Sequence, residues 1–124
     1  MRLRIIRVEG PDDNKEGVEK IFLNAQAGIN LNDYLLYDTT FTDDDKQSNK
    51  GRHIYRFPNF EIDETHNIVL WIAKGPRLGT KLLADKTKGH RFYWGRTGPI
   101  INNTGDNLTL VRIAAEQLFE VAPE

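Results

Sequence analysis

The chain has 124 residues, a length that fits one domain able to bury a full hydrophobic core. It contains no cysteine, which excludes disulfides and thiolate metal sites. Its 17 basic and 18 acidic residues give a net charge of -1, so nucleic acid or an anionic membrane is not expected as an obligatory partner. No apolar run approaches the roughly 18 residues of a membrane span, and the stretch after Met1 is too short for a signal peptide. These features do not predict the cellular compartment of the protein.

Alternating apolar and polar residues, the pattern of half-buried strands, dominate the first half of the chain. They predict strands over residues 2–8, 18–23, 34–38 and 53–57, separated by turn-forming residues such as Gly10 and Pro11. Residues 39–51 are the most polar stretch. Its Asp43, Asp44 and Asp45 predict a solvated loop rather than a calcium site, because an EF-hand spaces its carboxylates alternately and ends in Glu.

The second half continues the same pattern. Residues 67–73 form the most apolar run, and their Ile, Val and Trp content favours a central strand over a buried helix. Residues 78–89 are predicted to be a loop with at most one helical turn, 91–94 a short strand, and 102–106 a tight turn. Residues 108–113 and 117–121 are predicted to pair as a hairpin. Eight or nine short strands with almost no helix signal predict an all-β sandwich or barrel.

Several short motifs share their order and spacing with those of a known domain family. The matching segments are Tyr55-Arg56-Phe57-Pro58, Trp71-Ile72-Ala73-Lys74-Gly75, Tyr93-Trp94-Gly95, Ile101-Asn102-Asn103-Thr104-Gly105-Asp106 with Leu108-Thr109-Leu110 after it, and, upstream, residues 18–24. Together these segments resemble the lamin tail domain of intermediate-filament proteins and its bacterial relatives. The resemblance implies one immunoglobulin-like β-sandwich over residues 1–124 and a role in contacts with proteins or chromatin. No heptad pattern is present, so filament assembly through a coiled coil does not carry over.

The two tryptophans are the aromatic residues that a ligand could stack on. Trp71 lies in the most apolar predicted strand, so we expect it to pack in the core rather than to bind a ligand. Trp94 stands between Tyr93 and Gly95, and we expect it to be structural but partly exposed.

Catalytic motifs are missing from the sequence. His53, His66 and His90 are widely separated and match neither H-x-x-x-H nor H-E-x-x-H, so no metal site is predicted. No G-x-S-x-G nucleophile elbow occurs. We therefore expect no enzyme activity, no catalytic residues, no cofactor and no small-molecule substrate.

Two functions fit these features. The first is an interaction or scaffolding module that binds a protein partner through sheet edges or loops. The alternative is sequence-independent binding of nucleic acid by a basic stretch over residues 77–96, in which Asp85 is the single acidic residue. We favour a protein partner, because acidic loops elsewhere balance this charge. The candidate binding residues of the basic stretch are Arg77, Lys81, Lys86, Lys88, Arg91 and Arg96.

Overall fold

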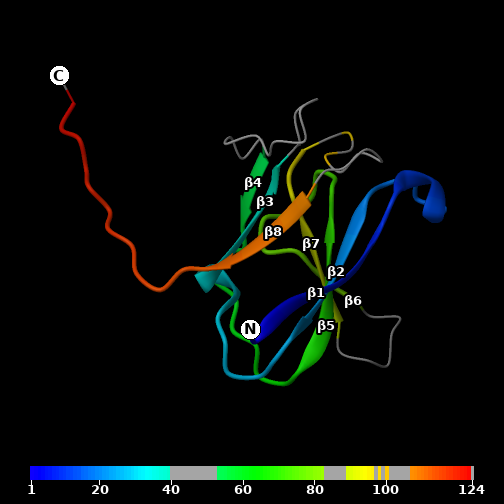
Figure 1. Ribbon diagram of the computed structural model, residues 1–124, viewed down its shortest axis with the longest axis horizontal. Helices are drawn as coiled ribbons and strands as arrows, with labels where there is room; N and C mark the ends of the chain where they lie inside the picture. The colour runs from blue at the N-terminus through cyan, green and yellow to red at the C-terminus, as the bar shows by residue number, and fades with distance from the viewer. Residues whose placement is uncertain (40–52, 83–88, 97, 99, 101–106, 124) are drawn as a thin grey trace.

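In a computed structural model the chain forms two β-sheets that pack against each other (Figure 1). The structure describes residues 1–39, 53–82, 89–96, 98, 100 and 107–123. This part holds eight strands and two 3-10 helices. They are β1 (Leu3–Glu9), η1 (Pro11–Asp13), β2 (Lys20–Ala25), η2 (Leu31–Asp33), β3 (Tyr34–Thr39), β4 (His53–Arg56), β5 (His66–Trp71), β6 (Thr80–Leu82), β7 (Gly89–Tyr93) and β8 (Asn107–Arg112).

The larger sheet has five strands in the order β1-β2-β5-β7-β6. Neighbouring strands run antiparallel except β5 and β7, which are parallel. The chain leaves β5, forms β6 at the far edge and returns as β7 between the two, which is why β7 runs in the direction of β5. The two edges of this sheet are therefore β1 and β6.

The edge strand β1 contains a bulge. Ile5 pairs with Leu23 of β2 and Arg7 pairs with the preceding residue, Phe22, so Ile6 is an extra residue with no partner of its own. In a regular strand, residues three apart point to opposite faces. The extra residue instead brings Arg7 to the outer face of the sheet, where its guanidinium carbon lies 3.8 Å from the centre of the Phe22 ring.

The smaller sheet has three antiparallel strands in the order β4-β3-β8. Asp38 of β3 is buried opposite His53 of β4. Its carboxylate accepts a hydrogen bond from the His53 backbone N–H at 2.8 Å and lies 3.1 Å from the ring Nδ1. This contact joins β3 to β4 at the end where β4 begins.

The core lies between the two sheets and is built from inward-facing side chains of the strands and of the segments that connect them. Its aromatic centre is formed by Phe57 and Phe92, which meet edge to face with ring centres 5.6 Å apart. Phe60 and Trp94, both partly buried, pack against this core. The arrangement is an all-β sandwich. The buried core residues are Leu3, Ile21, Leu23, Ala25, Leu31, Tyr34, Leu36, Tyr55, Phe57, Ile62, Ile68, Leu70, Ile72, Phe92 and Ile100.

The structure confirms the predicted strands at the start of the chain and the central strand in residues 67–73, but three predictions are wrong. Residues 80–82, predicted as loop, form strand β6. Residues 117–121, predicted to pair with the preceding strand, form no strand. Trp71 is not in the core, because it points to the outer face of the sheet. The predicted polar loop with Asp43, Asp44 and Asp45 and the predicted turn at 102–106 lie outside the described residues.

Candidate functional site

The outer face of the five-stranded sheet carries aromatic rings stacked with basic side chains. The ring of Trp71 has the Lys20 Nζ 4.5 Å from its centre and the Arg91 guanidinium carbon at 3.7 Å. Tyr93 meets the same tryptophan with ring centres 6.3 Å apart. Lys20, Trp71 and Tyr93 are register neighbours on β2, β5 and β7. Strand pairing brings these three residues together, and Arg91, two residues before Tyr93 on the same face of β7, stacks on the tryptophan. We call these four residues the outer aromatic layer.

Two glycines let the loop after β5 pass close to this layer. A Cβ on Gly75 would collide with the ring of Tyr93, and a Cβ on Gly79 would collide with the carbonyl oxygen of Arg91. Gly79 also has a φ of +78°, which side-chain-bearing residues rarely adopt. Close packing thus requires both glycines of the G-P-R-L-G sequence between β5 and β6.

The cations of the outer aromatic layer are engaged within the chain. The Lys20 ammonium forms an ion pair with Glu16 at 3.1 Å, and this hydrogen bond lowers the pKa of the Glu16 carboxyl. The Arg91 Nε is buried and finds no hydrogen-bond partner within the described residues. The guanidinium of Arg91 stacks on Trp71, and a cation over an indole ring gains about 0.5–2 kcal/mol. The layer is primarily structural.

The predicted basic stretch is divided among different surroundings. Arg77 donates a hydrogen bond to the Arg56 carbonyl oxygen at 3.2 Å, and its guanidinium carbon lies 5.8 Å from the ring centre of Tyr55. Arg91 stacks instead on Trp71. Tyr55 belongs to the core and Trp71 to the outer face. Arg77 and Arg91, two members of the predicted basic stretch, therefore lie on different surfaces.

The other members of the stretch are described only in part. The Nε of Arg96 is buried and finds no partner in the described part of the chain. Lys81 belongs to β6, of which the backbone alone is placed. Lys86 and Lys88 lie outside the described residues. A joint role of the six basic residues therefore stays a prediction.

Tyr55 combines burial with an unpaired hydroxyl. Its hydroxyl oxygen has no hydrogen-bond partner among the described residues. Burial raises the pKa of Tyr55 to about 12, and the positive charge of Arg77 opposes part of that rise. The ring contacts Phe57 and Trp94, with centres 5.0 Å and 5.4 Å away. A neutral phenol of this kind serves packing rather than proton transfer near neutral pH.

One buried carboxylate was not predicted from the sequence. Glu19 is almost fully buried, and its side chain accepts a hydrogen bond from the backbone N–H of Ile100. Its own carbonyl oxygen accepts from the Ile72 N–H at 2.9 Å. Glu19 therefore connects the start of β2 to two distant segments, and the alternating pattern around it gave no sign that a charged residue would face inward.

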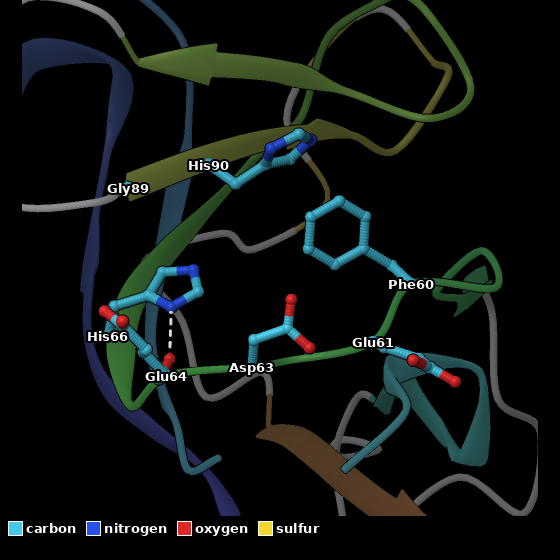
Figure 2. Close-up of a pocket in the computed structure, with 7 residues that line it drawn as sticks. All are labelled: Phe60, Glu61, Asp63, Glu64, His66, Gly89 and His90. Carbon is cyan, nitrogen blue, oxygen red and sulfur yellow. Dashed lines mark hydrogen bonds between the residues drawn. The ribbon is translucent and has the colours of Figure 1, made fainter. Parts of the chain in front are cut away.

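A pocket of about 420 Å³ opens beside the segment between β4 and β5 (Figure 2). The rings of Phe60 and His90 pack against each other in its wall, with centres 4.5 Å apart and planes tilted by 47°, and the carboxylate of Asp63 points into it. Three carboxylates and two imidazoles make the pocket acidic with an aromatic wall. Its lining residues are Phe60, Glu61, Asp63, Glu64, His66, Gly89 and His90.

The histidines of this pocket are tethered to the backbone. The His66 Nδ1 lies 2.6 Å from the Glu64 carbonyl oxygen, and the His90 Nε2 lies 2.8 Å from that of Leu78. Each therefore uses one ring nitrogen as a hydrogen-bond donor. His53 lies elsewhere, against Asp38, so the fold brings together two of the three histidines. Within the described residues no three acidic or histidine side chains are arranged to hold a metal ion.

The open edge of β1 is a surface that sequence reasoning did not single out. Ile6 and Val8 are 49% and 40% exposed there, and Arg4 is also exposed. The backbone groups of an edge strand that face away from the sheet have no neighbouring strand. The edge therefore combines unpaired backbone groups with apolar side chains, and the bulge interrupts it at Ile6.

The last described residues, 113–123, form an extended segment that we call the C-terminal tail. It runs away from the sandwich in Figure 1 (orange to red) and belongs to neither sheet. Its large apolar side chains are exposed to solvent: Leu118, Phe119 and Val121 are 86%, 76% and 83% exposed. Such a concentration of exposed apolar residues commonly marks an interaction site.

The root of the tail is fixed to the sandwich. The Ile113 N–H donates to the Asp33 carbonyl oxygen at 2.7 Å. Glu116 accepts two hydrogen bonds from the guanidinium of Arg56, at 2.6 Å and 2.9 Å. This pairing lowers the pKa of Glu116 and raises that of Arg56. The tail therefore leaves the body beside β3 and β4.

Comparison of the chain with protein-family models, with curated proteins and with solved structures found no match. The resemblance to the lamin tail domain thus rests on the sequence motifs alone. The described part of the chain also holds no helix long and apolar enough to cross a membrane.

Proposed function

We propose that this chain is a single interaction module, an immunoglobulin-like sandwich of the lamin tail type, that binds a protein partner through a sheet edge and has no chemistry of its own. The observation that carries the proposal is the open edge of β1, with its exposed Ile6 and Val8. A strand added there would gain main-chain hydrogen bonds and cover apolar surface at the same time.

The other edges offer less to a partner. The edge strand β6 has three residues, β4 has four and β8 has six, whereas β1 has seven. Strand β8 also carries no large apolar side chain as exposed as Ile6 or Val8. Each residue added to a ladder contributes backbone hydrogen bonds, so a longer edge supports a stronger complex. Of the edge strands in the larger sheet, β1 is thus the better acceptor.

The surroundings of the basic residues favour a protein partner over nucleic acid. Arg77 and Arg91 lie against aromatic rings of their own chain, on different parts of the sandwich. A grip on a phosphate backbone needs several cations aligned along one surface. Binding of nucleic acid through the basic stretch is the alternative, and the experiment must distinguish it from binding of a protein partner.

The experiment is affinity capture from lysate with the wild-type chain and with the variant Ile6→Lys. A matched control is Leu78→Lys, at a residue that is also exposed but lies in a loop. A charged side chain on the edge strand opposes strand addition, so Ile6→Lys should lose the partner while Leu78→Lys keeps it. Captures are repeated at low and high salt and with nuclease.

The outcomes separate the candidate functions. A protein partner that survives nuclease, weakens only modestly with salt and is lost with Ile6→Lys supports the edge proposal. Capture that disappears with nuclease and falls by about 0.9 in log–log salt slope per phosphate supports nucleic-acid binding instead. Measurable turnover in a hydrolase panel, with no partner recovered, would overturn the proposal that the chain is an interaction module.

A further inference from the structure

We propose that the edge of β1 accepts the C-terminal tail of a second copy of this chain, with residues 117–121 added as a strand. This inference rests on the proposed function, because it uses the same edge and names its partner. It joins two features that remain unpaired in one copy: an edge strand without a neighbour and an extended segment outside both sheets.

The tail has a sequence that favours a β-strand, but it pairs with no strand of the described chain. Residues 117–121 read Gln-Leu-Phe-Glu-Val, and β-branched and aromatic residues favour extended structure. The structure holds this segment extended and unpaired, with Leu118, Phe119 and Val121 bare. A segment that favours a strand and exposes apolar side chains gains most from pairing with an edge.

The tail does not reach β1 of its own chain. The Arg56–Glu116 pair fixes its root beside β4, in the three-stranded sheet, and β1 is an edge of the five-stranded sheet. Figure 1 shows the tail leaving on the side of β3 and β4 and ending well clear of the sandwich. A second copy therefore supplies the acceptor edge.

The side chains of donor and acceptor match in kind. In an extended strand alternate residues share a face, so Phe119 and Val121 lie on one side and Leu118 and Glu120 on the other. On β1, Leu3 and Ile5 face the core and Arg4 faces outward. Alignment of the apolar sides extends the core past β1, and it places the Glu120 carboxylate on the same face as the guanidinium of Arg4.

The bulge strengthens the charge match. Because Ile6 is the extra residue, Arg4 and Arg7 share the outer face instead of pointing to opposite sides. Arg7 already pairs with Glu9, whereas Arg4 forms no ion pair within the described residues. Arg4 is accordingly the cation that Glu120 of the other copy meets.

Exchange of tails between two copies closes on itself. If each tail occupies the β1 edge of the other copy, every contact occurs twice, related by a two-fold axis. The assembly is then a dimer rather than a growing fibre, and both exposed edges are covered together.

The experiment measures the mass of the full chain by sedimentation equilibrium over a range of concentrations. Wild type should dimerise as concentration rises, and the variant F119S/V121S should remain monomeric. Leu78→Ser and Ile54→Lys are controls, since Leu78 is an exposed loop residue and Ile54 lies on the β4 edge. Both should dimerise like wild type, whereas Ile6→Lys should not.

Charge reversal tests the pairing itself. Glu120→Arg and Arg4→Glu should each raise the dimer dissociation constant by about tenfold, because each contact occurs twice and attraction becomes repulsion. The double variant E120R/R4E should restore it. All of these residues are exposed, so unchanged melting temperatures will show that the sandwich stays folded.

Several results would overturn the inference: a wild-type monomer up to about 1 mM, a typical upper concentration for weak association; a dimer that persists in F119S/V121S; or no recovery in the double charge variant. If the monomer nevertheless captures another protein through Ile6, self-association fails while the proposed function stands. If neither a dimer nor an edge-dependent partner is found, both fail.

Discussion

The two faces of the β5–β7 pair carry aromatic residues in opposite surroundings. On the inner face, Leu70 and Phe92 are register partners, fully buried under the second sheet. On the outer face, Trp71 is partly exposed, and Arg91 stacks on it. Leu70 and Trp71 are adjacent in the sequence, yet Leu70 lies among apolar side chains and Trp71 lies against cations.

The contrast shows that an aromatic residue in an apolar strand does not identify the core. A sheet packed on one side only buries one face, and the other must be made compatible with water. Here the outer rings are screened by the aliphatic stems and charges of Lys20 and Arg91. The inner face should therefore contribute far more to stability than the outer face.

The largest effect is expected for Phe92→Ala. Phe92 is fully buried and contacts the rings of Phe57 and Phe60, so truncation should cost about 3–5 kcal/mol of unfolding free energy. The matched control is Phe22→Ala on the outer face, which should cost about 1 kcal/mol, in the range of a cation–π contact with partial burial. Urea denaturation measures both, and equal losses would contradict the contrast between the faces.

The next effect is a loss of stability at alkaline pH caused by Tyr55. Its pKa is raised to about 12 in the folded chain from an ordinary value of 10.0, so its contribution is complete below pH 10 and is lost as pH rises toward 12. Two pKa units correspond to about 2–3 kcal/mol. Denaturation of wild type and Tyr55→Phe from pH 8 to 12 should show a shallower decline in the variant. Parallel curves would mean that the phenol ionises freely.

A smaller effect is expected for Trp71→Ala. The ring lies outside the core, so its loss should cost about 1–2 kcal/mol, which corresponds to two cation–π contacts of about 0.5–1 kcal/mol each at a partly exposed site. Trp94→Ala, which removes a ring packed against the core, should cost more. The melting temperatures of the two variants decide the order, and a greater loss for Trp71 would restore the expectation from sequence.

The smallest effect concerns the tail root. The pKa of Glu116 is lowered by Arg56, so the pair is intact above the ordinary carboxylate range and is lost as pH falls through the lowered pKa. Glu116→Gln should free residues 114–123 at neutral pH without changing the melting temperature, while the Ile113 backbone stays bonded to Asp33. Backbone relaxation of dilute, monomeric protein measures this motion, with Glu120→Gln as control. A tail equally mobile in wild type would show that the pair does not hold it.

Much of the fold follows from local pattern. The run Ile68-Val69-Leu70 is too short for a helix between its turn signals and too apolar for an edge, and it became a central strand between β2 and β7. The orientation of Trp71 could not be deduced, because residues on both sides of that strand are apolar and alternation gives no sign of direction.

The misjudged elements depend on contacts that are distant in sequence. Residues 80–82 are a strand because β7 pairs with them, although three residues carry too little pattern to predict one. Residues 117–121 carry a clear pattern but lack a partner within the described chain. The pocket at Asp63 and His90 likewise depends on the fold joining two segments, although the local sequence Asp63-Glu64-Thr65-His66 was a usable signal.

The bulge in β1 also bears on how this chain tolerates changes in length. Ile6 is one residue more than the pairing of β1 with β2 requires, so its deletion would leave Leu3, Ile5 and Val8 on the side they already occupy. Loss of a residue from β2 instead would turn every later side chain of that strand to the opposite face. Deletion of Ile6 should therefore leave the sandwich folded, whereas deletion of one residue within β2 should not.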